Sequence, residues 1–185
     1  QLIDLTTGER RVLVRYQSRF SAISPDGTKV AVSRFGDMIE ILDRASGKPV
    51  LTLAGHHGDM YAMAFSADGR RLLTAAKSRA QGLFLDEFEG HGPAVPDDTV
   101  RAWDLENGRE LRKWEQKASC AAISPDGRTL FAGCADGRVR RMDVESGKRL
   151  DALVLHAGAV TAVAVSAGGL AASADAAGVA VWRSF

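Results

Sequence analysis

Short apolar runs separated by turn residues fill this chain. The runs SAISP, KVAVS, MIEIL and PVLTL follow one another between residues 21 and 53. Four runs of the same kind, YAMAF, RLLTA, TVRAW and ELRKW, return between residues 61 and 114. Each run is rich in β-branched or aromatic residues or alternates partly with a period of two, which is typical of strands. The pattern predicts an all-β chain built from a repeated unit of four strands.

Two turn signatures recur in phase with these runs. The first is the tetrad SPDG or a degenerate copy of it, and its copies begin at Ser24, Ser66, Ser124 and Ser166. Successive copies are therefore 42, 58 and 42 residues apart, so the middle interval is longer by 16. The second signature is an apolar residue, an Asp and, four positions after the Asp, a Gly; its copies begin at Ile3, Leu42, Trp103 and Met142. Four strands in roughly 40 residues, joined by tight turns and repeated, predict the blades of a β-propeller.

One stretch carries a resemblance to a known family. The residues AGHHGDMYAMAFSADGRRLLTAA, followed by DDTVRAWDLENG, resemble the WD-repeat family. They include its Gly-His pair, at Gly55 and His56, and its Trp-Asp pair, at Trp103 and Asp104. The resemblance covers the whole chain apart from the segment 77–98. It implies antiparallel blades of four strands, named a to d from the inside outward, that radiate from a central channel.

The repeats divide the chain into one partial unit and four further units. We expect strands c and d of a preceding blade over 1–19, and blades over 20–54, 55–116, 117–156 and 157–185, the last of them without strand d. Such a set does not close into a simple ring. We therefore expect the C-terminal part of a propeller of seven or eight blades. The remaining blades would come from the same longer chain or from another chain, because bare strand edges favour association.

The resemblance also implies a role for His56. In the family, this His bonds an Asp of the b–c turn and is linked through a Ser or Thr of strand b to the Trp of strand c. The matching residues here are His56, Thr74, Asp97 and Trp103. A satisfied buried network of this kind makes a blade rigid, so the role implied is structural. We expect it in the unit 55–116 alone, as the only unit with all four residue types at the family spacing.

Composition excludes few function classes. The 185 residues are 45% hydrophobic and 25% charged, with a net charge of +1, which is an ordinary globular balance. A net charge near zero gives no support for nucleic-acid binding. No apolar run approaches the roughly 20 residues that span a bilayer. We expect no nucleic acid, membrane or cofactor as a partner, and a cytoplasmic location.

The two cysteines are too few for a disulfide scaffold. Cys120 and Cys134 fall nearly opposite each other around the second SPDG turn, so a cross-strand disulfide is conceivable. Two buried free thiols that act as small apolar residues are the favoured alternative.

The segment 77–98 interrupts the repeat between strands b and c of its blade. Long loops in compact domains are usually functional or disordered. Its acids and histidine match no metal motif, and the chain shows no nucleophile elbow or phosphate-binding glycine loop, so we predict neither a metal site nor catalysis. In the family, b–c and d–a loops share one face. We predict a binding site on that face, built from Arg19, Tyr61, Phe84, Asp86, Glu87, Phe88 and Glu89. Packing of the two phenylalanines against their own blade is the competing interpretation.

The chain is therefore interpreted as a non-catalytic scaffold that binds a protein or peptide. Two alternatives stay open. The chain could be the regulatory or targeting propeller of a longer enzyme such as a kinase or protease, which catalytic motifs in an adjoining domain would reveal. It could also be a propeller whose small-ligand or catalytic site is completed by further blades. Architecture alone does not identify a partner.

Overall fold

Every element of the structure is a β-strand. The computed structural model describes residues 2–3, 10–13, 18, 20–34, 38–78, 96–166 and 168–183. None of these residues is helical. Two short strands, β1 (Leu2–Ile3) and β2 (Arg10–Arg11), pair antiparallel, and four larger sheets follow along the chain. The all-β fold class, with four-stranded antiparallel sheets, is confirmed.

Each of the larger sheets is a meander of strands in chain order. The first sheet holds β3 (Ser21–Ile23), β4 (Lys29–Arg34), β5 (Met38–Asp43) and β6 (Pro49–Ala54). The second sheet holds β7 (Asp59–Phe65), β8 (Arg71–Lys77), β9 (Thr99–Asp104) and β10 (Glu110–Glu115). The third sheet holds β11 (Cys120–Ile123), β12 (Thr129–Gly133), β13 (Arg138–Asp143) and β14 (Arg149–Val154). The fourth sheet has three strands, β15 (Ala162–Val165), β16 (Leu170–Ala174) and β17 (Val179–Arg183).

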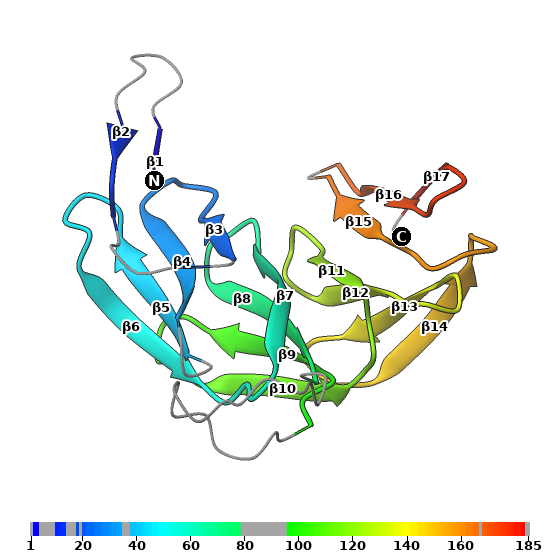
Figure 1. Ribbon diagram of the computed structural model, residues 1–185, viewed down its shortest axis with the longest axis horizontal. Coiled ribbons are helices and arrows are strands. Elements are labelled where there is room, and N and C mark those ends of the chain that lie inside the picture. Colours follow the sequence, from blue (N-terminus) through cyan, green and yellow to red (C-terminus); the bar gives the residue numbers. More distant parts are fainter. Residues whose placement is uncertain are drawn as a thin grey trace, which may run out of the picture.

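The sheets stand side by side in an open arc (Figure 1). The first strand of each sheet lies on the inner side of the arc, and the last strands β6, β10 and β14 lie on the outer side. This is how propeller blades are arranged, and the ring is not closed by the described residues. The domain boundaries inferred from the repeats stay a prediction.

The tetrad turns are built by their own side chains. In the first copy, Asp26 accepts hydrogen bonds from the Ser24 hydroxyl at 2.6 Å and from the Thr28 N–H at 3.0 Å, and Gly27 has a φ of +69°. The Ser24 hydroxyl and the Thr28 bonds lower the pKa of Asp26 to about 2. The copies at Ser66 and Ser124 repeat the Ser–Asp bond. The copy at Ser166 has Gly168 in place of the Asp and cannot form it.

The core lies between neighbouring sheets. Leu72 packs in a cluster shared by the first and second sheets, whereas the next residue, Leu73, packs in a cluster shared by the second and third. In the third sheet, Leu130 packs toward the second sheet, and the next residue, Phe131, packs toward the fourth sheet. Successive side chains of a strand point to opposite faces, so both faces of an inner strand are buried. This explains why these strands read as apolar runs with only partial alternation.

The two cysteines are free thiols. Cys120 is paired with Gly133 across the β11–β12 ladder, which leaves Cys134 one residue out of register. Neighbouring residues on a strand point to opposite faces, so the sulfurs diverge. Cys120 Sγ contacts the carbonyl of Val160, just before β15, at 3.7 Å, and Cys134 Sγ accepts from Gln116 Nε2 at 3.4 Å. Burial raises the pKa of the Cys120 thiol to about 11.

Candidate functional site

A hydrogen-bonded chain of four side chains crosses the second sheet. His56 Nδ1 lies 2.8 Å from Asp97 Oδ2, and His56 Nε2 lies 2.8 Å from Thr74 Oγ1. Trp103 Nε1 donates to the same Thr74 oxygen at 2.8 Å. All four residues are buried. The structure therefore brings together the four residues that the sequence predicts for the network.

The partners decide which way the protons point in this chain. An indole N–H can only donate, and an ionised carboxylate can only accept. Trp103 therefore donates to Thr74, the Thr74 hydroxyl donates to His56 Nε2, and His56 Nδ1 donates to Asp97. In this direction every hydrogen-bonding group of the four side chains has a partner. No lone pair or proton of the ring is left for a substrate.

Asp97 accepts hydrogen bonds from two further groups besides His56. Its carboxylate also accepts the His57 backbone N–H at 2.7 Å and the Thr99 hydroxyl. Burial by itself would raise the pKa of Asp97, but the bonds from His56, Thr99 and His57 outweigh it and hold this pKa well below its usual range. The Arg101 guanidinium lies 3.8 Å away and pairs with Glu110 at 2.6 Å. Asp97 is thus ionised and fully engaged at neutral pH.

The fourth sheet contains a second, incomplete network that the sequence analysis missed. His156 Nε2 lies 2.7 Å from Ser173 Oγ, and His156 Nδ1 lies 3.5 Å from Asp175 Oδ1. Trp182 of β17 lies opposite Ala171 of β16, just as Trp103 of β9 lies opposite Leu72 of β8. The buried Nε1 of Trp182 has no partner among the described residues. This second set is not at the family spacing, so the expectation that only the unit 55–116 keeps all four residue types at that spacing stays a prediction. Ser173 follows Ser166 by seven residues, whereas Thr74 follows Ser66 by eight, and this one-residue shift hid the match.

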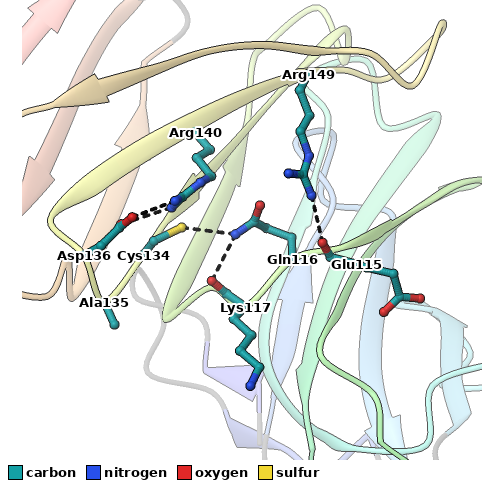
Figure 2. A pocket seen from close by; sticks show the side chains of 8 residues that line it. All are labelled: Glu115, Gln116, Lys117, Cys134, Ala135, Asp136, Arg140 and Arg149. Carbon is teal, nitrogen blue, oxygen red and sulfur yellow. Dashed lines mark hydrogen bonds and ion pairs between the residues drawn. The ribbon is translucent and has the colours of Figure 1, made fainter.

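A cleft of about 340 Å³ opens between the second and third sheets. One wall is the end of β10 and the β10–β11 connection, with Glu115, Gln116 and Lys117. The other wall is the β12–β13 turn with β13 and β14, which supply Cys134, Ala135, Asp136, Arg140 and Arg149. Figure 2 shows the side chains of Arg140 and Arg149 descending on either side of Gln116. The cleft lies where a d–a connection meets a b–c turn. The sequence offered no signal for it, because its walls come from different repeats.

The charges in the cleft are unevenly paired. Arg140 binds Asp136 through two bonds, of 3.0 and 2.6 Å, so these two charges compensate each other. Arg149 donates to the backbone carbonyl of Glu115 at 3.0 Å and has no carboxylate partner among the described residues. The Glu115 carboxylate instead pairs with Lys113 at 2.9 Å and points away from Arg149 in Figure 2. The Arg149 guanidinium therefore keeps a positive charge that no carboxylate of the described residues compensates.

Most residues of the predicted binding site lie outside the described residues. This holds for Arg19 and for Phe84, Asp86, Glu87, Phe88 and Glu89. Tyr61 is described: it is partly buried against the cluster between the second and third sheets. Its hydroxyl oxygen is buried close to the Ala118 backbone but meets no partner with hydrogen-bond geometry, and burial raises its pKa. Tyr61 is thus mainly a packing residue, with only part of its ring open to a partner.

Comparisons with known proteins identify the repeats. The family described as "WD domain, G-beta repeat" matches residues 47–104, and the family described as "Anaphase-promoting complex subunit 4 WD40 domain" matches residues 100–167. Together the two matches span both complete blades at the centre of the arc. The chain belongs to the WD-repeat family. The four sheets are accordingly WD-repeat blades, and the His56 network lies in the blade that keeps both signature pairs.

Several curated proteins resemble this WD-repeat chain. Autophagy-related protein 16 of Arabidopsis thaliana is 29% identical over 157 residues, which cover 71% of this chain and 31% of that protein. Protein groucho of Drosophila melanogaster is 28% identical over 131 residues, or 68% of this chain and 15% of the relative. Apoptotic protease-activating factor 1 of Danio rerio is 28% identical over 160 residues, which cover 82% of this chain and 11% of that protein. The chain thus spans a third or less of the length of these relatives.

Two further properties bear on the function classes. Across the described residues, no helix is long and apolar enough to cross a membrane. Within the same residues, no three His, Cys, Asp or Glu side chains gather as a metal ion would require.

Proposed function

We propose that this chain is a non-catalytic interaction module that binds a protein segment on the face carrying the b–c and d–a connections. The observation that supports this most directly is the cleft between the second and third sheets. It opens between connections of these two kinds, and its rim residues Lys117 and Ala135 are exposed. A concave site with several convergent polar groups is a usual place for recognition.

The predicted site around the segment 77–98 belongs to the same proposal. This segment connects β8 to β9, so it is a b–c connection like the turn that carries Ala135 and Asp136. Its ends are tied down, because Asp97 N donates to the Ser78 hydroxyl at 3.1 Å and Ser78 N donates to Asp98 at 3.1 Å. We propose that Arg19, the open part of Tyr61 and the acids and phenylalanines of 84–89 extend the binding face beyond the cleft.

The His56 network has a structural part in this proposal. The His56 and Asp97 side chains are 0% and 1% exposed, and each of their hydrogen-bonding groups already has a partner. A reacting histidine needs a free nitrogen within reach of a substrate. The network instead fixes the start of β7 against the β8–β9 connection. A cytoplasmic location is kept as part of the proposal.

A peptide selection tests the proposed function. Peptides that bind the purified protein are selected from a random display library and measured against two matched variants. Ala135→Trp places a bulky neutral side chain at the rim of the cleft, and Ala45→Trp places the same side chain on an exposed β5–β6 turn at the other end of the strands. We expect about tenfold weaker binding for Ala135→Trp alone, since loss of a good interface contact has this size. Selected peptides that ignore Ala135→Trp, or a selection with no saturable binder, would refute the proposal.

A further inference from the structure

The cleft carries information about its ligand, because its lining has an excess of one positive charge. The lining includes three cations, Lys117, Arg140 and Arg149, and two acids, Glu115 and Asp136. The Glu115 carboxylate is paired with Lys113. Arg140 and Asp136 form a bidentate pair. The Lys117 ammonium is loosely paired with Asp98 at 3.6 Å, and its side chain is 85% exposed. What remains inside the cleft is the guanidinium of Arg149.

Arg149 is held in place although no carboxylate of the described residues pairs with it. Its Nη2 donates across the sheet boundary to the Glu115 carbonyl at 3.0 Å. A planar guanidinium has five N–H donors, so this single bond leaves several free to meet a ligand. Gln116, buried between the two arginines, is itself fixed by bonds from its Nε2 to the Lys117 carbonyl at 3.1 Å and to Cys134 Sγ at 3.4 Å. Figure 2 shows Gln116 directed to Cys134 and Lys117, and the Arg149 guanidinium directed to Glu115.

We propose that the cleft binds the carboxylate of an Asp or Glu side chain in a partner segment, with Arg149 as its principal ligand. This inference rests on the proposed function and deepens it. Guanidinium and carboxylate form short, charge-assisted pairs of matching fork geometry. The Asp136 carboxylate already occupies the donors of Arg140 that point toward it. A single excess charge therefore suits a monoanion, and a dianionic phosphate would meet the field of Asp136.

The side chain of an acidic residue suits this cleft better than a chain terminus. Two residues of the rim, Lys117 and Ala135, are exposed, so a continuous segment can cross it. Such a segment would set one acid between the sheets, and its backbone would run along the loop face.

The test uses defined capped peptides and the intact protein. Four heptapeptides share one neutral sequence and differ at the centre: Glu, Gln, phosphoserine, or Ala with a free C-terminal carboxylate. Binding is followed by NMR through the side-chain N–H signals of Arg140, Arg149 and Gln116. We expect the Glu peptide to shift these signals and to bind about two- to fivefold more tightly than the Gln peptide at low salt, with the difference shrinking as salt screens the pair.

Two variants localise the effect. Arg149→Gln should remove the preference for Glu over Gln, and Arg109→Gln should leave it unchanged, since Arg109 is an exposed arginine in the β9–β10 turn at the other end of the sheet. The melting temperature of each variant shows whether it is folded. If Arg149→Gln does not fold, Arg149→Lys replaces it, and we expect that lysine to keep part of the preference because it keeps the charge without the fork.

Several outcomes would overturn the inference. They are equal binding of the Glu and Gln peptides, tighter binding of the phosphoserine peptide, tighter binding of the free carboxylate terminus, and an unchanged preference in Arg149→Gln. Failure here is distinct from failure of the proposed function. Library peptides that are blocked by Ala135→Trp but need neither an acid nor Arg149 would refute this inference and leave the interaction module intact.

Discussion

The second and fourth sheets each carry a His, an Asp, a Trp and a hydroxyl residue, which is Thr74 in one and Ser173 in the other, but the two sets are bonded differently. In the second sheet, His56 is 2.8 Å from both Asp97 and Thr74, and Trp103 completes the chain. In the fourth sheet, His156 keeps its hydroxyl partner at 2.7 Å, but its Asp175 partner is at 3.5 Å. Trp182 Nε1 is buried without a partner among the described residues. Residue types alone therefore do not make the network; the indole must also reach the hydroxyl.

Packing explains the different fate of the two tryptophans. Trp182 lies against Phe131 of the third sheet with ring centroids 5.3 Å apart, a tilted aromatic contact. Trp103 instead makes a T-shaped contact with His56, with ring centroids 6.4 Å apart, and keeps its N–H directed to Thr74. The fourth sheet also ends at β17, whose Val179 and Val181 are 70% and 63% exposed. The complete network thus occurs in a blade covered on both sides, and the incomplete one in a blade with an open edge among the described residues.

Removing the Thr74 hydroxyl, which bridges Trp103 and His56, should cause the largest loss of stability. Thr74→Val strands both the Trp103 N–H and the His56 ring nitrogen in a buried site, so we expect the free energy of unfolding to fall by about 2–4 kcal/mol. Ser173→Ala strands only the His156 nitrogen, so the matching loss should be about 1 kcal/mol. Urea unfolding of both variants measures the two losses. Equal losses would show that the Trp103 bond contributes nothing.

Removing the carboxylate of Asp97 should have the next largest effect and should depend on pH. Asp97→Asn should lower the free energy of unfolding by about 1–3 kcal/mol at pH 7, because it weakens the contact with a buried His. The lowered pKa of Asp97 means that its contribution is complete above the unfolded value of about 3.9 and is lost as pH falls toward the folded value. The gap between wild type and Asp97→Asn should therefore be constant from pH 7 to about pH 5 and narrow below pH 4. A gap that widens toward acid pH would contradict this sign.

The two indole N–H groups offer a sharper contrast. Trp103→Phe removes a paired donor and leaves the Thr74 hydroxyl short of one bond, so we expect a loss of about 1–3 kcal/mol beyond the lost packing. Trp182→Phe removes a buried donor that had no partner, so the lost packing should be largely offset and the net change should be below about 1 kcal/mol. Thermal unfolding of the two variants measures the difference. A larger loss for Trp182→Phe would show that its N–H has a partner in solution.

The smallest expected effect on folding concerns the connections themselves. In the fourth sheet, a short turn joins β16 to β17, and Asp175 follows Ser173 by only two residues. In the second sheet, a long connection joins β8 to β9, and Asp97 follows Thr74 by 23 residues. Deleting residues 81–92 should change the free energy of unfolding by less than about 0.5 kcal/mol, because Ser78, Asp97 and Asp98 tie the two ends independently. The same deletion should weaken binding of the selected peptides. If peptide affinity is unchanged while stability falls, the segment is part of the architecture and the predicted contacts of Phe84 and Phe88 are wrong.

The network of the second sheet could be predicted from the sequence and the fourth-sheet network could not, although both are local to one repeat. Thr74 and Trp103 sit at the family spacing, so alignment of the repeats finds them. Ser173 is displaced by one residue, and in a strand with a period of two such a shift hides the match unless the shortened turn before it is recognised.

Sequence by itself determined the all-β class, the repeated meander and the tetrad turns. These depend on contacts within about 40 residues: period-two patterning, the Ser–Asp bond of each tetrad, and the positive φ of glycines such as Gly27. Only the tertiary structure decided which faces meet. The opposite directions of Cys120 and Cys134 depend on the β11–β12 register, and the cleft at Arg149 depends on how the second and third sheets pack. Contacts between repeats join residues that no local pattern relates, so their charges and distances appear only once the sheets stand side by side.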